Sequence, residues 1–257
     1  MTPLPLSGRR VVVTRPSGQA DRLAGLIRAA GGEALLFPVL EIRDAEDPRP
    51  LLSLIERLDA FDLAVFVSAN AVEKALDLVR AQRAWPAGLR VATVGRASAR
   101  ALARYGFDAV LVPDASFDSE ALLDLPELKD MAGKRVVIFR GDGGRELLGD
   151  TLAARGAAVE YAECYRRWRP QADVAPLLAR CEEHSLDAFT VSSSEGLANL
   201  STMLGAAGRR CLERTPLFAP HERIASAARK LGVQTVVLTE AGDEGMIEGL
   251  SVFFAKV

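Results

Sequence analysis

At residues 11–18 the chain reads Val11-Val12-Val13-Thr14-Arg15-Pro16-Ser17-Gly18, a short apolar run that ends in a turn and leads into an amphipathic helix. The same unit occurs six times, with apolar runs at residues 11–14, 63–67, 91–94, 136–139, 189–191 and 217–219. Each unit presents the free backbone N–H groups of a helix N-terminus beyond the end of a strand, where the amides and the helix dipole bind anions. Six such units predict a ligand that carries several negative groups.

Helices and strands alternate along the chain. Three helices repeat the apolar spacing i, i+3, i+4, i+7 of one buried stripe: Ala20, Leu23, Ala24 and Ile27; Val72, Ala75, Leu76 and Val79; Ile224, Ala227, Ala228 and Leu231. Glycines at expected left-handed C-caps (Gly31-Gly32, Gly106, Gly156 and Gly232) precede further β-rich runs at 34–37, 109–112, 158–162 and 235–238. Strand, helix, glycine, strand is typical of βαβ units, so we predict an α/β fold with parallel sheets covered on both faces.

Length and composition exclude several classes of protein. With 257 residues, 49% apolar and 26% charged, the chain has the composition of an average soluble protein with one large domain or two ordinary ones. No apolar run is long enough to cross a bilayer, and residues 1–6 lack the features of a signal peptide, so we expect a cytoplasmic protein without membrane contact. The net charge of −2 argues against nucleic acid as a partner.

Cysteines and histidines are few. Cys164, Cys181 and Cys211 are odd in number and share no metal-ligand spacing, so we expect neither a disulfide framework nor a zinc site. Only His184 and His221 are available, which makes a histidine-rich metal centre improbable.

Two extended segments interrupt the alternation and suggest crossings between domains. One is residues 36–42, with a proline inside an extended run, and the other is residues 163–170, which is basic and also ends in proline. We therefore predict two similar doubly wound parallel-sheet domains, joined by a two-stranded hinge with a cleft between them. Residues 1–38 and 167–257 form the first, discontinuous domain, and residues 39–166 form the inserted one.

A glycine-rich turn at residues 140–145 opens a helix. It lacks both the G-x-G-x-x-G spacing and the lysine of a P-loop, so the motif argues against a nucleotide site. Two interpretations stay open: a glycine nest around Gly141 that binds a carboxylate or phosphate, and a plain tight turn. Arg15, Arg140 and Arg145 are the expected ionic supplements to such backbone sites.

Hydroxyl side chains occupy other turns. Asn70 is the expected N-cap of its helix, with Glu73 as capping-box acid, and Ser68 precedes it at the strand tip. One serine of the run Ser192, Ser193 and Ser194 is expected to cap the next helix. No base shows partnering spacing, so we reject a serine hydrolase.

Four further residues have structural interpretations. His221 lies at the first turn of its helix, where a hydrogen-bonding side chain is expected. From position alone, Tyr105, Tyr161 and Tyr165 are interpreted as packing residues, although Tyr165 lies on the second crossing, where it could face the cleft.

Six blocks of the chain, in order, resemble the uroporphyrinogen-III synthase family: residues 11–16, 66–72, 94–99, 162–167, 191–196 and 220–225. The resemblance implies a lyase without metal or organic cofactor that converts the linear hydroxymethylbilane to uroporphyrinogen III, losing water and inverting the last pyrrole ring, ring D. It implies that Tyr165 assists departure of the hydroxyl, and that the turn of Gly95 and Ser98 binds substrate, with serine where other members often carry threonine. The turn at His221 differs from that of members with hydroxyl residues there, so the resemblance implies that backbone amides of this turn bind the substrate.

The tetrapyrrole substrate implied by this resemblance is rich in carboxylates, which the helix N-termini could bind. We expect strand-tip amides to contribute more to binding than any single basic residue. We also expect a monomer, with transient contact to the upstream pathway enzyme. The alternative is a non-catalytic two-lobed sensor of a small polyanionic metabolite, which needs the same fold but no proton donor at Tyr165.

Overall fold

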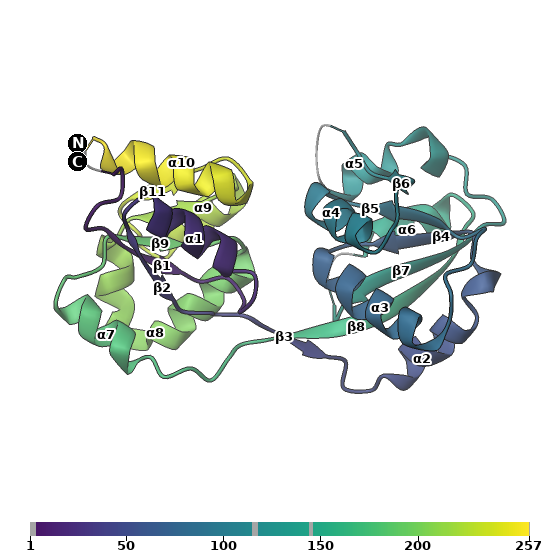
Figure 1. The fold of residues 1–257 in the computed structure, drawn as a ribbon, viewed down its shortest axis with the longest axis horizontal. Coiled ribbons are helices and arrows are strands. Elements are labelled where there is room, and N and C mark those ends of the chain that lie inside the picture. Colours follow the sequence, from purple (N-terminus) through teal and green to yellow (C-terminus); the bar gives the residue numbers. More distant parts are fainter. Residues whose placement is uncertain (1–3, 115–117, 144–145, 257) are drawn as a thin grey trace. The chain divides into compact units, whose positions relative to one another are not determined.

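The computed structural model describes residues 4–114, 118–143 and 146–256. The chain divides into two compact units, one of Met1–Glu41 with Trp168–Val257 and one of Ile42–Arg167 (Figure 1). The units change at residues 41/42 and 167/168, whereas the domains expected from sequence change at 38/39 and 166/167. The hinge and the cleft stay predictions.

The discontinuous unit contains a five-stranded sheet. Its strands are β1 (Arg10–Val13), β2 (Glu33–Leu36), β9 (Ala188–Thr190), β10 (Leu217–Ala219) and β11 (Val236–Leu238), in the order β11-β10-β9-β1-β2. Each of the four neighbouring pairs is parallel. The chain adds β2 on one side of β1 and the later strands on the other. The strand order therefore reverses between β1 and β9, which is the topological switch point of this sheet.

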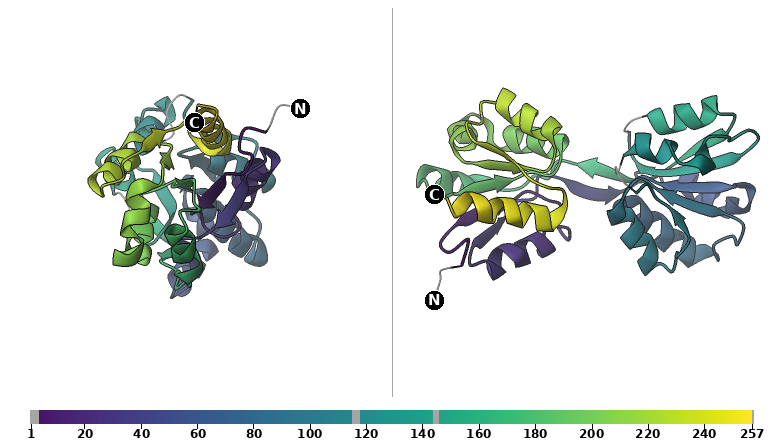
Figure 2. Two further views of the ribbon diagram at one scale, coloured as in Figure 1. Left: turned by 90° about the vertical axis from the view of Figure 1, so that its left-hand side faces the viewer. Right: turned by 90° about the horizontal axis from the view of Figure 1, so that it is seen from above.

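Helices cover both faces of this sheet (Figure 2). Helices α1 (Asp21–Ala29) and α10 (Gly242–Phe254) pack on one face, and α7 (Ala175–Glu182), α8 (Ser194–Arg214) and α9 (Glu222–Lys230) pack on the other. Successive side chains of β1 point to opposite faces of the sheet. Val11 and Val13 therefore pack in the core with α1 and α10, while Val12 packs in the core with α7, α8 and α9. Helix α8 is interrupted at Gly205, whose φ is 57°.

The inserted unit contains a six-stranded sheet. Its strands are β3 (Glu41–Asp44), β4 (Leu63–Phe66), β5 (Arg90–Thr93), β6 (Val110–Leu111), β7 (Arg135–Gly141) and β8 (Ala158–Trp168), in the order β3-β8-β7-β4-β5-β6. The pairs of β4 with β5 and β7, of β5 with β6 and of β7 with β8 are parallel. From β4 the chain first proceeds to β5 and β6 and then returns to β7, so the switch point lies between β4 and β7.

This sheet also has two covered faces. Helices α2 (Arg49–Glu56), α3 (Ala69–Gln82) and α4 (Arg96–Arg104) share one core with Ala64 and Phe66, while α5 (Ser119–Leu123) and α6 (Leu147–Ala154) share the other with Leu63 and Val65. Two short 3-10 turns, Leu58–Ala60 and Pro126–Leu128, complete the unit. The strands are apolar on both faces because each face is covered by helices.

The expected α/β class of two doubly wound parallel-sheet domains is confirmed. Each of the six apolar runs contains a strand that leads toward a helix, and Gly31, Gly106, Gly156 and Gly232 have positive φ after helices. One member of the predicted stripes is wrong. Leu231 follows the end of α9 and is 37% exposed, because the helix stops one residue before the stripe would close.

The cysteines were not expected to form a disulfide framework, and the structure corrects this by showing one disulfide. Cys181 on α7 and Cys211 on α8 are bonded, with Cα atoms 5.4 Å apart, while Cys164 is a buried free thiol. The two residues are 30 positions apart in sequence. Only the packing of α7 against α8 brings them together, so counting cysteines could not find the pair.

Within residues 4–114, 118–143 and 146–256, no helix is both long and apolar enough to span a bilayer.

The disulfide predicts a specific pattern of thiol labelling. We expect no label on the native protein, because burial raises the pKa of the Cys164 thiol to about 12 and the other two sulfurs are bonded. The denatured protein should take one label without reductant and three with it. Reduction should also lower the free energy of unfolding by about 3.6 kcal/mol, because the unfolded chain regains the entropy that closing a loop of this length removes. Three labels without reductant would contradict the disulfide.

Candidate active site

A tyrosine and a serine from two elements share a hydrogen bond in the inserted unit. The hydroxyls of Tyr165, near the end of β8, and Ser68, directly before α3, are 3.0 Å apart. Ser68 is also the N-cap of α3, where its Oγ accepts a hydrogen bond of 3.1 Å from the amide of Ala71. Either hydroxyl can donate in the bond between Ser68 and Tyr165, because Ser68 Oγ keeps both its proton and a second lone pair after accepting from the amide.

Tyr165 is buried by an irregularity in strand pairing. The register of β7 with β8 pairs Arg140 with Glu163 but Gly141 with Tyr165, so Cys164 is an extra residue on β8. Simple alternation would turn Tyr165 to the same side as the exposed Glu163, yet Cys164 and Tyr165 are both buried. This is a β-bulge, a feature that re-aims a side chain.

Gly141 makes room for the phenol ring. A Cβ at this position would lie 2.6 Å from Cε2 of Tyr165, closer than real Cβ atoms approach other heavy atoms. The need for glycine here comes from this contact, since the ring packs directly on the backbone of β7.

The end of β8 is held by a second set of contacts. The amide of Asp142 donates to the carbonyl of Tyr165 at 2.9 Å, and the carboxylate of Asp142 accepts from the amide of Arg167 at 3.0 Å. The guanidinium of Arg167 in turn donates to the Asp142 carbonyl at 3.1 Å. These bonds fix the backbone on both sides of the bulge.

Arg140 carries a positive charge into the interior beside this pair. Only 6% exposed, it donates to the carbonyl of Gly143 at 3.0 Å and to Glu146 at 3.1 Å, and its guanidinium lies 4.7 Å from the ring centre of Tyr161. Hydrogen bonds from Tyr161 first, and then from Arg140, hold the pKa of Glu146 below its usual value. Burial and the bond to Glu146 raise the pKa of Tyr161 to about 12, so this phenol stays neutral.

These residues line one pocket of about 250 Å³. Its walls are Val67, Ser68, Ser119, Ile138, Arg140, Gly141, Gly143, Leu148, Tyr161, Tyr165 and Arg167. Among these described residues are two arginines, two serines and two tyrosines, but no carboxylate. The pocket therefore suits an anionic ligand with a group that accepts a hydrogen bond from a hydroxyl.

The pocket lies at the switch point of its sheet. Ser68 follows β4 and Gly141 ends β7, and these neighbouring strands are the two between which the order reverses. Ligands of open α/β sheets bind at this place, beyond the carboxyl ends of the strands. Topology and side-chain chemistry thus indicate the same site.

The discontinuous unit has a corresponding switch point between β1 and β9. Thr14 follows β1 and donates to the Thr190 carbonyl at 2.7 Å, which joins the two strand ends. After β9, Ser193 caps α8 by accepting from the amide of Gly196 at 2.9 Å. The Oγ of Ser194 is buried without a hydrogen-bond partner among the described residues, and Ser192 is exposed.

A family model described as uroporphyrinogen-III synthase HemD matches residues 21–248. The chain belongs to the uroporphyrinogen-III synthase family.

Named relatives cover nearly the whole chain. It is 38% identical over 236 residues to a uroporphyrinogen-III synthase of Salmonella typhimurium, covering 91% of this chain and 96% of the relative. It is 36% identical over 235 residues to that of Escherichia coli, with the same coverage of both chains.

Solved structures of uroporphyrinogen-III synthases resemble the fold. A mutant from Thermus thermophilus has a TM-score of 0.66 at 21% identity, with 97% of this chain and 100% of that one covered. The protein from Helicobacter pylori has a TM-score of 0.58 at 14% identity, with 93% and 97% covered. At these identities the likeness shows the shared fold.

Four of the predicted site residues of this uroporphyrinogen-III synthase family member meet in the pocket of the inserted unit: Ser68, Arg140, Gly141 and Tyr165. Gly95, the N-cap of α4, and the buried Ser98 follow the neighbouring strand β5. Arg15, Ser192, Ser193, Ser194 and His221 follow strands of the other sheet. Arg15 forms an ion pair with Asp243, and Arg145 lies outside the described residues.

Two structural assignments need correction. Asn70 is not the N-cap of α3; it is the second residue of the helix, because Ser68 has the extended backbone and makes the capping bond. His221 is the N-cap of α9, but its imidazole accepts no hydrogen bond from the first amides of the helix. The side chain is exposed instead.

Tyr161 and Arg167 also line the pocket but were missed as site residues. The interpretation of Tyr161 as packing overlooked its exposure of 38% and its bond to Glu146. A period-2 pattern over residues 158–168 could have placed Tyr161 on the face opposite Ala162. The same pattern could not have shown that Tyr161, Tyr165 and Arg167 line one pocket, because the bulge changes the alternation between them.

We expect Gly141→Ala to displace the Tyr165 ring and to lower the free energy of unfolding by about 1–3 kcal/mol, the usual cost of overpacking. Gly88→Ala is the matched control, because a Cβ at Gly88 meets no atom within 4 Å and Gly88 has no positive φ. Denaturant unfolding measures the stability of both variants. Equal stability of Gly141→Ala and the parent protein would show that the Tyr165 ring does not need to pack this closely on the backbone of Gly141.

Proposed function

We propose that this chain cyclises hydroxymethylbilane to uroporphyrinogen III, with loss of water and inversion of ring D, in tetrapyrrole biosynthesis. Membership of the family supports the reaction. The observation on the structure that carries the proposal is the pair of Tyr165 and Ser68 beside Arg140 at the switch point of one sheet. This pocket combines a proton donor with positive charge for a carboxylate-rich substrate.

Tyr165 is proposed to assist departure of the substrate hydroxyl. The Ala71 amide donates to Ser68 Oγ. We propose that Ser68 in turn donates to Tyr165 Oη across their 3.0 Å contact, which leaves the phenol proton for the leaving oxygen. Each bond polarises the next one, and the N-terminus of α3 lies at the start of this series. The phenol can stabilise the departing hydroxyl by donation without becoming ionised.

Arg140 and Arg167 are proposed to bind carboxylates of the substrate. Loss of the hydroxyl leaves a cationic azafulvene, so positive side chains would not stabilise that centre directly. The two arginines would instead hold acetate or propionate groups of the substrate and thereby orient its rings. Arg140 is rigid enough for this role, because it is buried and held by Gly143 and Glu146.

Orientation is the main task of this reaction. The linear substrate tends to close without inversion, whereas attack at the substituted carbon of ring D gives the spiro intermediate that leads to inversion. We propose that the backbone amides at the turns of Gly95, Ser98, Ser193 and His221 hold further carboxylates, and that the buried hydroxyl of Ser194 donates to one of them. None of these roles calls for a metal or an organic cofactor.

The sensor alternative receives no support from the comparisons, which name synthases. We further propose that the chain acts as a cytoplasmic monomer and contacts the upstream pathway enzyme transiently. Sedimentation velocity of the protein, alone and mixed with that enzyme, measures both the monomer and the contact.

Product analysis tests the proposed function. Freshly made hydroxymethylbilane is incubated with the protein, and the porphyrin isomers are separated after oxidation. We expect the inverted isomer III to dominate, because the bound substrate cannot close directly. An isomer mixture equal to that of the protein-free control would overturn the proposal.

Tyr165→Phe tests the proton donor. We expect turnover to fall about 100-fold or more, since a positioned acid contributes on this order, while stability changes by about 1 kcal/mol. Tyr105→Phe is the matched control, because its hydroxyl donates to Asp77 at 2.7 Å and does not line the pocket. Equal turnover of Tyr165→Phe and Tyr105→Phe would leave Tyr165 as a packing residue.

A further inference from the structure

A second pocket lies at the opposite end of the sheet in the discontinuous unit. Its volume is about 470 Å³, and Leu186 and Pro216, which line it, come shortly before β9 and β10. The turns proposed to bind substrate follow the other ends of these strands. The pocket therefore belongs to the amino edge of the sheet and shares no residue with the candidate active site.

Positive side chains dominate the walls of this pocket. Arg180 of α7 and Arg210 and Arg214 of α8 line it, with Glu182 as the carboxylate among the lining residues. Arg180 is paired with Glu33 at 3.1 Å, but Arg210 and Arg214 form no ion pair with any described carboxylate.

The spacing of these two arginines is unfavourable by itself. Arg210 and Arg214 are one helical turn apart, where like charges destabilise a helix. The adjacent position on the same helix shows the usual arrangement, because Arg209 pairs with Glu213 at 3.1 Å with i,i+4 spacing. A bound anion would relieve the repulsion between Arg210 and Arg214.

His184 places a further polar group on the wall of this pocket. It follows the C-cap of α7 with a φ of 50°, the left-handed position where helices usually have glycine. Among the described residues it is the only non-glycine residue with positive φ. The chain thus carries a histidine, whose imidazole offers a hydrogen-bond donor, at a position that costs a side chain about 1 kcal/mol.

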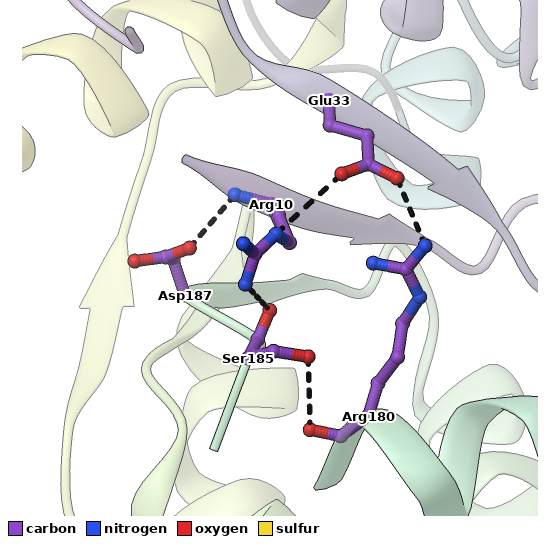
Figure 3. A network of polar contacts seen from close by, with 5 residues as sticks. All are labelled: Arg10, Glu33, Arg180, Ser185 and Asp187. Atoms are coloured by element: carbon purple, nitrogen blue, oxygen red, sulfur yellow. Dashed lines mark hydrogen bonds and ion pairs between the residues drawn. The ribbon is translucent and has the colours of Figure 1, made fainter. Parts of the chain in front are cut away.

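The walls are held in place by two sets of contacts. Arg180 and Arg210 directly precede Cys181 and Cys211, so the disulfide fixes the two arginine-bearing walls to each other. Figure 3 shows the second set, in which Arg10 donates to the Ser185 carbonyl at 2.9 Å and Ser185 donates to the Arg180 carbonyl at 3.2 Å. The loop that carries His184 is thereby tied to β1.

We propose that this pocket binds a small oxyanion with two or more negative charges, held by Arg210 and Arg214 and by the imidazole of His184. Guanidinium groups bind carboxylate and phosphate oxygens through paired hydrogen bonds, so both polycarboxylates and phosphates belong to the ligand class. The site is independent of the proposed function.

Calorimetric titration of the intact, oxidised protein with citrate and, separately, with pyrophosphate tests the proposal. We expect at least one of them to bind, and Arg210→Ala/Arg214→Ala to weaken that binding about tenfold or more. Arg209→Ala is the matched control from the same helix, and we expect it to bind like the parent protein. Both double and single variants should retain turnover of hydroxymethylbilane, because none of these residues belongs to the candidate active site.

The two anions separate the possible sources of the ligand. Binding of citrate alone would restrict the class to polycarboxylates, and binding of pyrophosphate alone would restrict it to phosphates. No binding of either anion by the parent protein would overturn the proposal. Equal binding by the parent protein and Arg210→Ala/Arg214→Ala would also overturn it, because the anion would then occupy another site.

Discussion

Parallel pairing of the strands is the constraint on which the rest of this structure depends. Because β1, β2, β9, β10 and β11 run in the same direction, as do β4, β5, β6, β7 and β8, the carboxyl ends of these strands meet at one edge of each sheet, and the helices that follow begin there. The crossover helices must pack back on the sheet, which explains why both faces of each sheet are apolar. Polar and functional groups are consequently concentrated at the strand ends, and the reversal of strand order leaves a gap between two crossovers.

In the inserted unit this gap contains a partly buried polar cluster whose members satisfy one another. A buried guanidinium is costly without partners, and Arg140 has the Gly143 carbonyl, Glu146 and the face of Tyr161. Tyr165 and Ser68 satisfy each other and the first turn of α3. These mutual contacts hold the groups in fixed orientations, as the proposed reaction requires.

The two edges of the sheet in the discontinuous unit have different electrostatic character. At the carboxyl edge, the charge of Arg15 is paired with Asp243, and the backbone amides of the helix N-termini provide positive potential. At the amino edge, positive potential comes from arginine side chains of α7 and α8, which the disulfide holds together. The two edges therefore offer different kinds of group to a negatively charged ligand.

Local pattern by itself determined the strands, the helices that follow them and the fold class, because apolar runs, i, i+3, i+4, i+7 stripes and C-cap glycines are properties of neighbouring residues. It also determined that Ser68, Arg140, Gly141 and Tyr165 lie near strand ends. Tertiary structure decided which of them meet, since the contact between β8 and the start of α3 joins residues 97 positions apart. It also decided the burial of Tyr165 by the bulge at Cys164 and the bond of Cys181 to Cys211. Each of these depends on strand register or helix packing, and neither is encoded in the spacing of residues along a single element.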